Sequence, residues 1–285
     1  MPKSWRDNSP PDAGCPRDWN WNVGINYAHY ANDVVSLGQG QTSLSLGNNI
    51  YAIVGHPYPV IQVNDFARDP QGKVIVDPVS GLPSQNPNLT TYGNTNPTHI
   101  LGVTSSLSYK AFTLSFVIDY RGGNEVYNQQ AATEAFTGVS QQSAQNGRQR
   151  FIFPNSVIPN GSGGYIPNTS VATNQGGDVE GSGFWPDIFS NNINSLFVDD
   201  ASFIKLREAN LMYQIPANFL QRNVSFIKKA SLSLLGRNLL MWRPKSNQWT
   251  DPEFSDAGSG NAIGSTSVGE TPPTRFYGAN LTVTF

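Results

Sequence analysis

The residues that could carry out chemistry are few, and their spacing fits none of the common catalytic or metal-binding motifs. Three histidines, His29, His56 and His99, lie too far apart in the sequence for a local metal-binding motif. The glycine-containing segment 258–264 is one residue too long for a dinucleotide fingerprint and lacks the preceding strand and following helix. Ser162 lies among glycines, but the G-x-S-x-G nucleophile elbow is absent. We therefore predict a protein that is not an enzyme, with no catalytic residue, no metal site and no cofactor.

The acidic residues of the first third of the chain fit turns better than a calcium site. Asp65, Asp69 and Asp77 do not have the spacing of an EF-hand loop. Asp69 instead begins the sequence Asp-Pro-Gln-Gly, with proline and glycine at the second and fourth positions of a type I turn. The segments 60–66 and 73–76 flank this turn, and we predict that they form a short hairpin.

Composition favours strands and long polar loops. Charged residues make up 13% of the 285 residues, against about 25% in an average domain. Hydrophobic residues total only 38%, aromatic residues reach 11%, and the net charge of −2 gives no electrostatic case for a nucleic-acid partner. A single cysteine, Cys15, excludes an internal disulfide. No apolar run approaches the roughly 18 residues of a membrane helix, so contact with a membrane would require strands.

The end of the chain alternates without a break between apolar and polar residues. One face of the segment 275–285 carries Tyr277, Ala279, Leu281, Val283 and Phe285, and the other carries Phe276, Gly278, Asn280, Thr282 and Thr284. This pattern fits a transmembrane barrel strand, and it also fits a half-buried strand of a soluble sandwich. The terminal aromatic ring favours the barrel, because the ends of soluble domains are usually frayed. We predict that Phe285, Val283, Leu281 and Tyr277 form a barrel-assembly signal.

The same alternation recurs in segments 19–27, 103–109, 112–120, 203–215 and 230–242. The second and third of these are separated by two residues and are predicted to form a hairpin. Asp119 and Arg121 fall on the polar face of this hairpin. A water-filled lumen accepts such charges, whereas the inner side of a soluble sandwich rarely does. The segments 129–150 and 217–229 are the most compatible with helices.

Several motifs, taken in order, resemble the C-terminal part of the SusC/RagA-type TonB-linked outer-membrane proteins of the Bacteroidetes. These motifs are SYKAFTL at 108–114, GNEVYN at 123–128, DASFIKLR at 200–207, LMYQIP at 211–216, GRNLLMW at 236–242, DPE at 251–253 and TPPTRFYG at 271–278. Each motif is short, but their order and spacing over residues 100–285 make the resemblance specific.

The resemblance implies an all-β fold that contributes the C-terminal strands of a transmembrane antiparallel β-barrel of roughly 22 strands. It also implies a cell outer-membrane location and import of oligosaccharides or peptides. The implied partners are a SusD-like surface lipoprotein, the TonB complex and outer-membrane lipid. We expect residues 1–285 to be the C-terminal portion of such a barrel, without the signal peptide, the TonB-contacting segment and the plug.

Aromatic residues in the long loops are the candidates for contact with a transported substrate. Tyr165, Trp185 and Trp249 could stack on the apolar faces of sugars, or they could pack the loops or join an aromatic girdle. A different class of function stays open at this point. A soluble secreted β-sandwich, either a carbohydrate-binding module or an adhesin, would also explain the strands, the tryptophans and the low charge.

Overall fold

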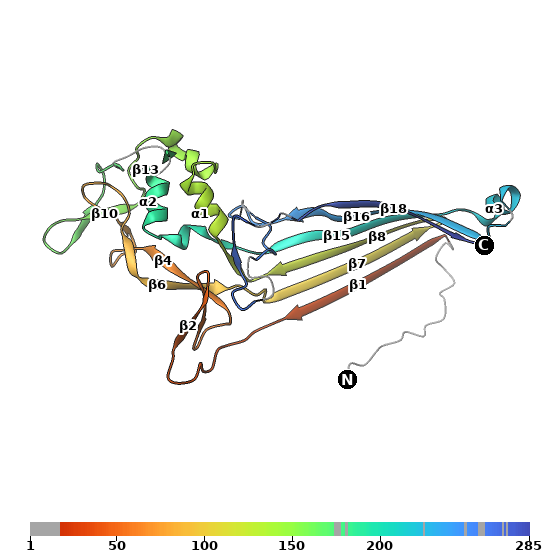
Figure 1. The fold of residues 1–285 in the computed structure, drawn as a ribbon, viewed down its shortest axis with the longest axis horizontal. Helices are drawn as coiled ribbons and strands as arrows, with labels where there is room; N and C mark the ends of the chain where they lie inside the picture. The colour runs from red at the N-terminus through yellow and green to blue at the C-terminus, as the bar shows by residue number, and fades with distance from the viewer. Residues whose placement is uncertain are drawn as a thin grey trace.

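A long antiparallel sheet and a folded loop region at one end of it make up the molecule (Figure 1). The structure is a computed structural model that describes residues 18–173, 178–179, 182–224, 226–247, 250–255, 260–269, 271 and 273–285. Among these residues, no helix combines the length and the apolar character needed to span a membrane.

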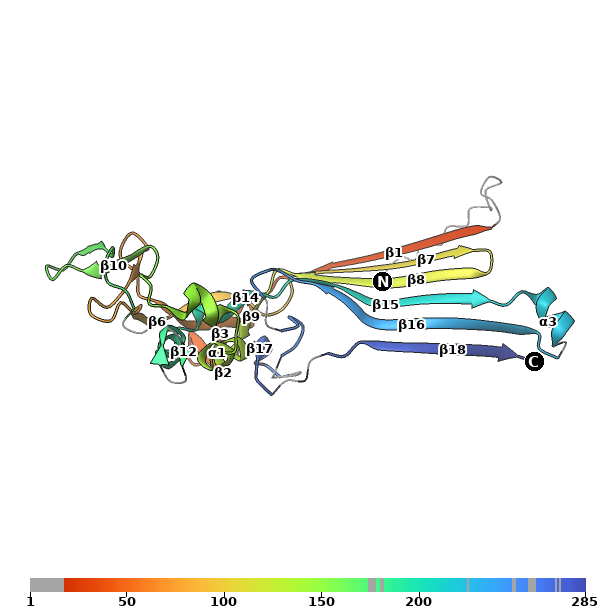
Figure 2. The same cartoon turned by 90° about the horizontal axis from the view of Figure 1, so that it is seen from above.

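Six strands form the sheet in the order β1-β7-β8-β15-β16-β18, and each pair of neighbours is antiparallel (Figure 2). Their bounds are β1 Trp19–His29, β7 His99–Tyr109, β8 Phe112–Gly122, β15 Phe203–Gln214, β16 Lys229–Trp242 and β18 Phe276–Thr284. The strands predicted from alternation are therefore confirmed, as is the hairpin of β7 and β8. The outer strands β1 and β18 are not paired with each other.

The pairing register brings the apolar side chains of all six strands onto one face. Leu107 of β7 lies opposite Leu114 of β8, and Leu232 of β16 lies opposite Leu281 of β18. A second sheet would bury this face in a sandwich, but Ile25 and Leu281 remain 67% and 62% exposed. An exposed apolar face is what a barrel wall presents to lipid, so the structure favours the barrel over the sandwich.

Aromatic rings mark both ends of the apolar face. Where β7 turns into β8, the rings of Trp19 and Tyr109 lie 4.2 Å apart between centroids, and those of Phe112 and Tyr213 lie 4.8 Å apart. Exposed aromatic side chains lie near the other end as well, at Tyr27 and Trp242. Two aromatic rows at opposite ends of an apolar band correspond to the two interfaces of a bilayer.

The opposite face of the sheet is polar. Ser231 and Ser233 of β16 pair with Thr282 and Asn280 of β18 on this side, and Asp119 of β8 pairs there with Lys205 of β15. Apart from Lys229, the first residue of β16, hydroxyl and amide groups occupy the part of this face nearest the β7–β8 turn, and most charged groups lie nearer the loop region. The polar face would line the lumen of a closed barrel.

The connections differ at the two ends of the sheet. At the chain-terminal end, β7 and β8 are joined by two residues, of which Lys110 has a positive φ of 51°. The helix α3 (Ala217–Asn223) lies between β15 and β16 at the same end. The connections at the other end are long, and they fold together as the loop region (Figure 1).

The loop region contains short strands in four sheets, together with short helices. The first sheet consists of β2 (Ser43–Gly47), β3 (Ile50–Ile53), β4 (Val60–Phe66) and β6 (Gln85–Asn94). The second consists of β14 (Val198–Asp200), β9 (Glu125–Asn128) and β17 (Ser265–Thr266). The third consists of β11 (Tyr165–Pro167), β10 (Ser156–Pro159) and β5 (Val74–Ile75). The fourth pairs β12 (Asp178–Val179) with β13 (Ser182–Gly183). The helices are α1 (Gln129–Phe136), α2 (Phe184–Ser190) and the 3-10 segments η1 (Gln142–Arg148) and η2 (Asn194–Phe197).

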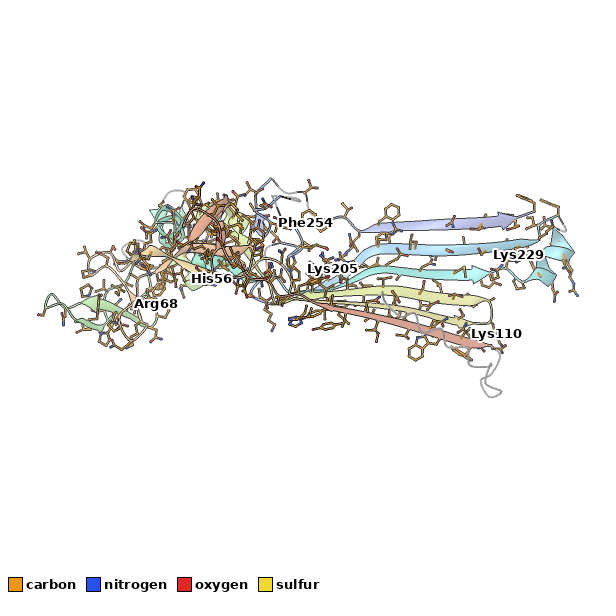
Figure 3. The ribbon with its side chains drawn as sticks, turned by 90° about the horizontal axis from the view of Figure 1, so that it is seen from below. His56, Arg68, Lys110, Lys205, Lys229 and Phe254 are labelled. Atoms are coloured by element: carbon orange, nitrogen blue, oxygen red, sulfur yellow. The ribbon has the colours of Figure 1, made fainter. Side chains whose placement is uncertain are left out.

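The hydrophobic core of the molecule lies in this loop region. Ile50 and Ile61 of the β2–β6 sheet pack in one cluster with Ala131 of α1, Ile188 of α2 and Phe197 of η2, all of them buried. The side chains of the six-stranded sheet in Figure 3 instead project from its two faces. The loop region is therefore held together as a soluble domain is, by apolar burial from water.

One predicted pairing in the loop region is wrong. The type I turn forms, with the Gly72 N–H donating to the Asp69 carbonyl at 2.9 Å, and the Asp69 carboxylate accepts two further backbone N–H groups. However, β4 pairs with β3 and β6, whereas β5 pairs in parallel with β10. The two segments that flank the turn meet only at the bridge between Arg68 and Val74, because β4 is already paired on both edges.

We predict that Leu281→Arg lowers the amount of the full-length protein inserted in a membrane far more than Thr282→Arg. Leu281 lies on the apolar face opposite Leu232, and Thr282 lies on the polar face opposite Ser231. An arginine costs about 2–4 kcal/mol on the lipid side near the bilayer midplane and much less on the lumen side. Surface-exposed protein, measured for both variants beside the wild type, checks this. Equal losses would show that the assigned facing is wrong.

Candidate functional site

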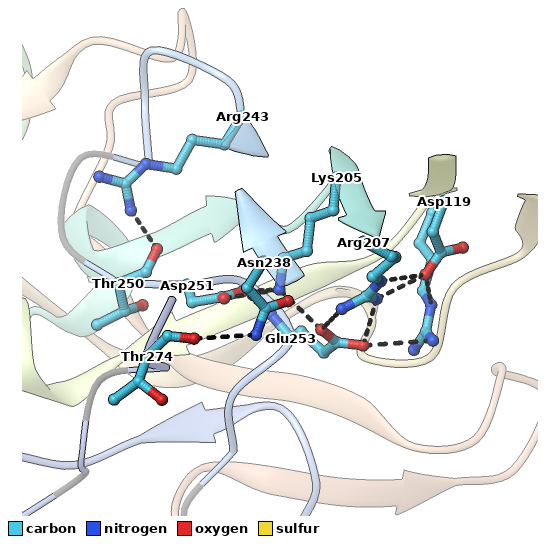
Figure 4. A network of polar contacts seen from close by, with 10 residues as sticks. Asp119, Lys205, Arg207, Asn238, Arg243, Thr250, Asp251, Glu253 and Thr274 are labelled. Atoms are coloured by element: carbon cyan, nitrogen blue, oxygen red, sulfur yellow. Dashed lines mark hydrogen bonds and ion pairs between the residues drawn. The ribbon is translucent and has the colours of Figure 1, made fainter. Parts of the chain in front are cut away.

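A cluster of charged side chains lies on the polar face of the sheet, where the sheet meets the loop region (Figure 4). We call it the junction cluster, and its members are Asp119 and Arg121 of β8, Lys205 and Arg207 of β15, and Asp251 and Glu253 of the β16–β18 connection. Three cations face three carboxylates, so the formal charges balance.

The hydrogen bonds of the junction cluster tie the β16–β18 connection to the sheet. Lys205 Nζ donates to both carboxylate oxygens of Asp251 at 2.6 Å and to Glu253 Oε2 at 2.7 Å. Arg207 donates to both oxygens of Glu253 at 2.6 Å each, and its Nε and Nη2 also donate to Asp119 Oδ2 at 3.1 and 2.6 Å. Charge-assisted, two-pronged bonds of this kind fix orientation as well as adding energy.

A β-bulge in β15 lets this strand contribute so many charges to one face. The register shifts between Leu206 and Glu208 against both neighbouring strands. Strict alternation would place Arg207 on the polar face and Glu208 on the apolar face. Because the bulge adds one residue, Glu208 and the polar residues after it stay on the polar side, and no charge is forced onto the apolar face.

The pKa of Glu253 shows that ion pairing outweighs burial in the junction cluster. Burial alone raises the pKa of this carboxyl, but the hydrogen bonds and positive charges of Arg207 and Lys205 outweigh burial and lower it from 4.5 to about 2. A lowered pKa in the folded state means that this attachment is fully present above about pH 4.5 and is lost as the pH falls towards 2. The connection therefore stays attached to the sheet throughout the neutral range.

The same connection also reaches into the loop region. Thr250 Oγ1 donates to Asn128 Oδ1 at 2.9 Å, and Asn128 Nδ2 donates to Asp199 Oδ2 at 2.6 Å. The Thr250 carbonyl accepts a hydrogen bond from Arg243 (Figure 4). Asn128 is completely buried and Asp199 nearly so. Burial raises the pKa of Asp199 to about 6, although Asn128 opposes the shift and Asp200 adds to it. Segment 250–253 is thus a strap between the two halves of the molecule.

The candidate aromatic residues lie in different surroundings. Trp185 is buried, and its ring packs against Phe184 at 5.2 Å and Phe197 at 6.2 Å between centroids. Tyr165 is 40% exposed and begins β11. Trp249 lies outside the described residues. Of the two rings that the structure describes, Trp185 therefore belongs to the core and Tyr165 to the surface.

The predicted assembly residues share one edge of the sheet. Tyr277, Leu281 and Val283 lie in β18 opposite Gly236, Leu232 and Ala230. The ring of Phe285 is 67% exposed and stacks on Phe226 from the α3–β16 connection, at 6.0 Å with an interplanar angle of 4°.

Sequence reasoning did not assign a role to Lys205, Asp251, Glu253 or Asp199. Lys205, Asp251 and Glu253 belong to motifs that carried the family resemblance, but their residue types gave no catalytic or metal-binding spacing. A lysine within an otherwise apolar stretch of a predicted strand was the available signal, because a buried lysine requires an acidic partner.

The histidines provide a further finding: His29 and His99 are cross-strand partners, with ring centroids 4.7 Å apart.

We predict that Lys205→Ala destabilises the full-length protein far more than Arg237→Ala. Lys205 pairs with Asp251 where both side chains are nearly buried, and removing one partner of a buried pair costs about 3–5 kcal/mol. Arg237 is the matched control, since it pairs with Glu208 at 3.1 Å while the two side chains are 59% and 38% exposed, and exposed pairs contribute about 0–1 kcal/mol. Chemical denaturation and limited proteolysis in detergent measure both variants. Similar effects would contradict a structural role for the junction cluster.

Comparison with known proteins agrees with this architecture. No family model matches the chain. TonB-dependent receptor P26 of Formosa agariphila is 26% identical in an alignment 263 positions long, which covers 87% of this chain and 24% of the receptor. TonB-dependent receptor P3 of the same organism is 22% identical in an alignment 279 positions long, which covers 89% of this chain and 25% of the receptor. The chain thus spans about a quarter of the length of the curated relatives it matches.

Solved structures show the same fold. The structure of the RagAB peptide transporter matches with a TM-score of 0.62 at 19% identity, over 95% of this chain and 28% of that one. The RagAB peptide importer in its "closed-closed" state gives the same TM-score, identity and coverage. The sheet with an apolar and a polar face, the folded loop region at one end and these matches lead to one conclusion: the chain is similar in sequence to part of two TonB-dependent receptors, and its fold matches part of the RagAB transporter.

Proposed function

We propose that this chain forms the C-terminal wall of an outer-membrane transporter that imports oligosaccharides or peptides with energy from the TonB complex. One observation carries the proposal: a single sheet presents an exposed apolar face bounded by aromatic rows and an opposite face of hydroxyl, amide and charged groups. Such a sheet separates lipid from a wet lumen. The loop region then lies at the extracellular mouth, because outer-membrane barrels have long loops outside and short turns in the periplasm.

The proposal includes a SusD-like lipoprotein that contacts the loop region. The likeness in fold to the RagAB peptide transporter and importer supports a partner of this kind. The loop region suits a docking role because it has its own buried core and is tied to the sheet by the junction cluster. A rigid surface loses less conformational entropy when a partner binds than a flexible one does.

Fractionation of the intact receptor tests the proposed location and assembly. We expect the receptor in the outer-membrane fraction, a difference in gel mobility between unheated and boiled samples, and co-purification of a SusD-like lipoprotein with a tagged receptor. A soluble receptor with no mobility difference would overturn the proposal. A heat-modifiable receptor that purifies alone would remove only the lipoprotein from it.

We predict that deletion of Phe285 lowers the outer-membrane level of the intact receptor without changing its synthesis. The residue extends the apolar edge formed by Tyr277, Leu281 and Val283, and burial of such a ring is worth roughly 1.5–3 kcal/mol. Phe226→Ala is the control, because it removes the stacking partner of Phe285 and keeps the terminal ring. If Phe226→Ala reduces the level as much as the deletion, the ring acts through local packing and is not an assembly signal.

A further inference from the structure

Two of the three histidines come together at the end of the apolar face that lies nearest the loop region. His29 is the last residue of β1 and His99 is the first residue of β7, and the two are cross-strand partners. Their ring centroids lie 4.7 Å apart, with an interplanar angle of 32°. His29 is exposed and His99 is half-buried, so an ion in the surroundings can reach the pair.

The hydrogen bonding of the pair leaves ring nitrogens available as ligands. Nδ1 of His99 and the Tyr27 hydroxyl group share a hydrogen bond of 2.8 Å. Among the described residues, Nε2 of His99 and the ring of His29 make no hydrogen bond. When an ion binds Nε2 of a neutral histidine, the proton of the ring is on Nδ1, which here donates it to the Tyr27 oxygen. A hydrogen bond of this kind orients a metal-binding ring and makes it a stronger ligand.

The separation of the two rings fits a shared metal ion. Zinc binds histidine nitrogens at about 2.0–2.1 Å in a tetrahedral arrangement, which places two such nitrogens roughly 3.4 Å apart. Rings whose centroids are 4.7 Å apart reach this spacing by a small rotation about χ2, which is a soft torsion in histidine. Imidazole suits zinc, copper and nickel, whereas calcium and magnesium take oxygen ligands.

The number of ligands indicates an open site. Among the described residues, no group of three or more histidine, cysteine, aspartate or glutamate side chains could hold a metal ion. Closed structural zinc sites have four protein ligands. Two ligands from the described part of the chain leave the other positions to water, so an ion bound here exchanges with its surroundings.

We propose that His29 and His99 chelate a divalent transition-metal ion of the zinc, copper and nickel class, and that Tyr27 orients His99. The pair closes the β1–β7 ladder at the point where both strands meet the loop region, so the ion fastens the two strands together there. An ion that binds only the paired strands stabilises them by mass action. The inference goes beyond the proposed function, since a barrel wall does not require a metal ion.

Calorimetric titration of the purified full-length protein in detergent with zinc chloride tests the site. We expect Tyr27→Phe to weaken the binding of one zinc equivalent about tenfold, which is the lower end of the loss when an orienting partner of a ligand is removed. His29→Gln and His99→Gln each remove a ligand and should weaken this equivalent at least as much. His56→Gln is the matched control, because it removes the exposed histidine of the loop region, and it should bind zinc as the wild type does.

Pulsed electron paramagnetic resonance with one equivalent of copper(II) counts the imidazole ligands directly, and on the wild type it needs no variant. Copper(II) is the tightest-binding divalent ion of its row at such sites. We expect two coordinated imidazoles in the wild type, in His56→Gln and in Tyr27→Phe, and one in His29→Gln and in His99→Gln. The count separates the loss of a ligand from the loss of its orientation, because Tyr27→Phe keeps both rings.

Several results would overturn the site. These are a wild type that binds neither ion, a single coordinated imidazole in the wild type, equal zinc binding by the wild type and the His29 and His99 variants, and an equal loss in His56→Gln. Unchanged affinity in Tyr27→Phe would overturn the role of Tyr27. A protein that fails these tests but is heat-modifiable in the outer membrane leaves the proposed function standing.

Discussion

The pairing register of the six long strands is the constraint on which the rest of the structure depends. Side chains alternate between the two faces, so a slip of one residue would exchange the apolar and the polar face of a strand. Leu232 opposite Leu281 and Ser231 opposite Thr282 show the register that keeps each class on its own side. In a sheet with one face against lipid, the backbone hydrogen bonds must also be made between strands, because lipid offers no partner for them. The pairing register and the surroundings of the two faces therefore require the same arrangement of side chains.

Most charged groups of the polar face lie in the part near the loop region, and this has a structural cause. Lys205 and Arg207 lie on the polar face just before the bulge of β15, and Asp251 and Glu253 come to them from a connection on the same end of the sheet. The half of the polar face near the β7–β8 turn carries serine, threonine and asparagine, such as Ser231, Ser233 and Asn280. Electrostatic attraction thus fixes the loop region to the sheet, whereas apolar burial holds the loop region itself together.

The sequence was informative where structure is periodic and local. The faces of β1, β8, β16 and β18 followed from alternation alone, and the type I turn at Asp69 followed from the positions of Pro70 and Gly72. The partners of β4 and β5 could not be predicted, because edge-to-edge pairing depends on segments far along the chain, such as β10.

The candidate site was harder to predict for the same reason. Asp199 and Asn128 are 71 positions apart, and Lys205 and Asp251 are 46 apart. Nothing in the local spacing of these residues indicates that they meet. The bulge at Arg207 also has no clear sequence signal, since alternation before it and after it looks regular when each part is taken alone. Short motifs marked where these residues lie, but the contacts between them appear only in the folded chain.

The origin of the loop-region core has a consequence for the stability of the sheet. Its buried residues come from two separate connections, with Ile50 and Val63 between β1 and β7, and Ala131 and Phe197 between β8 and β15. Neither connection alone supplies the whole core, so strand pairing that brings the two connections together removes part of the loop-closure entropy that the core must otherwise overcome. Core and sheet therefore stabilise each other: unpairing β7 from β8 or β15 would separate the two connections that the core joins.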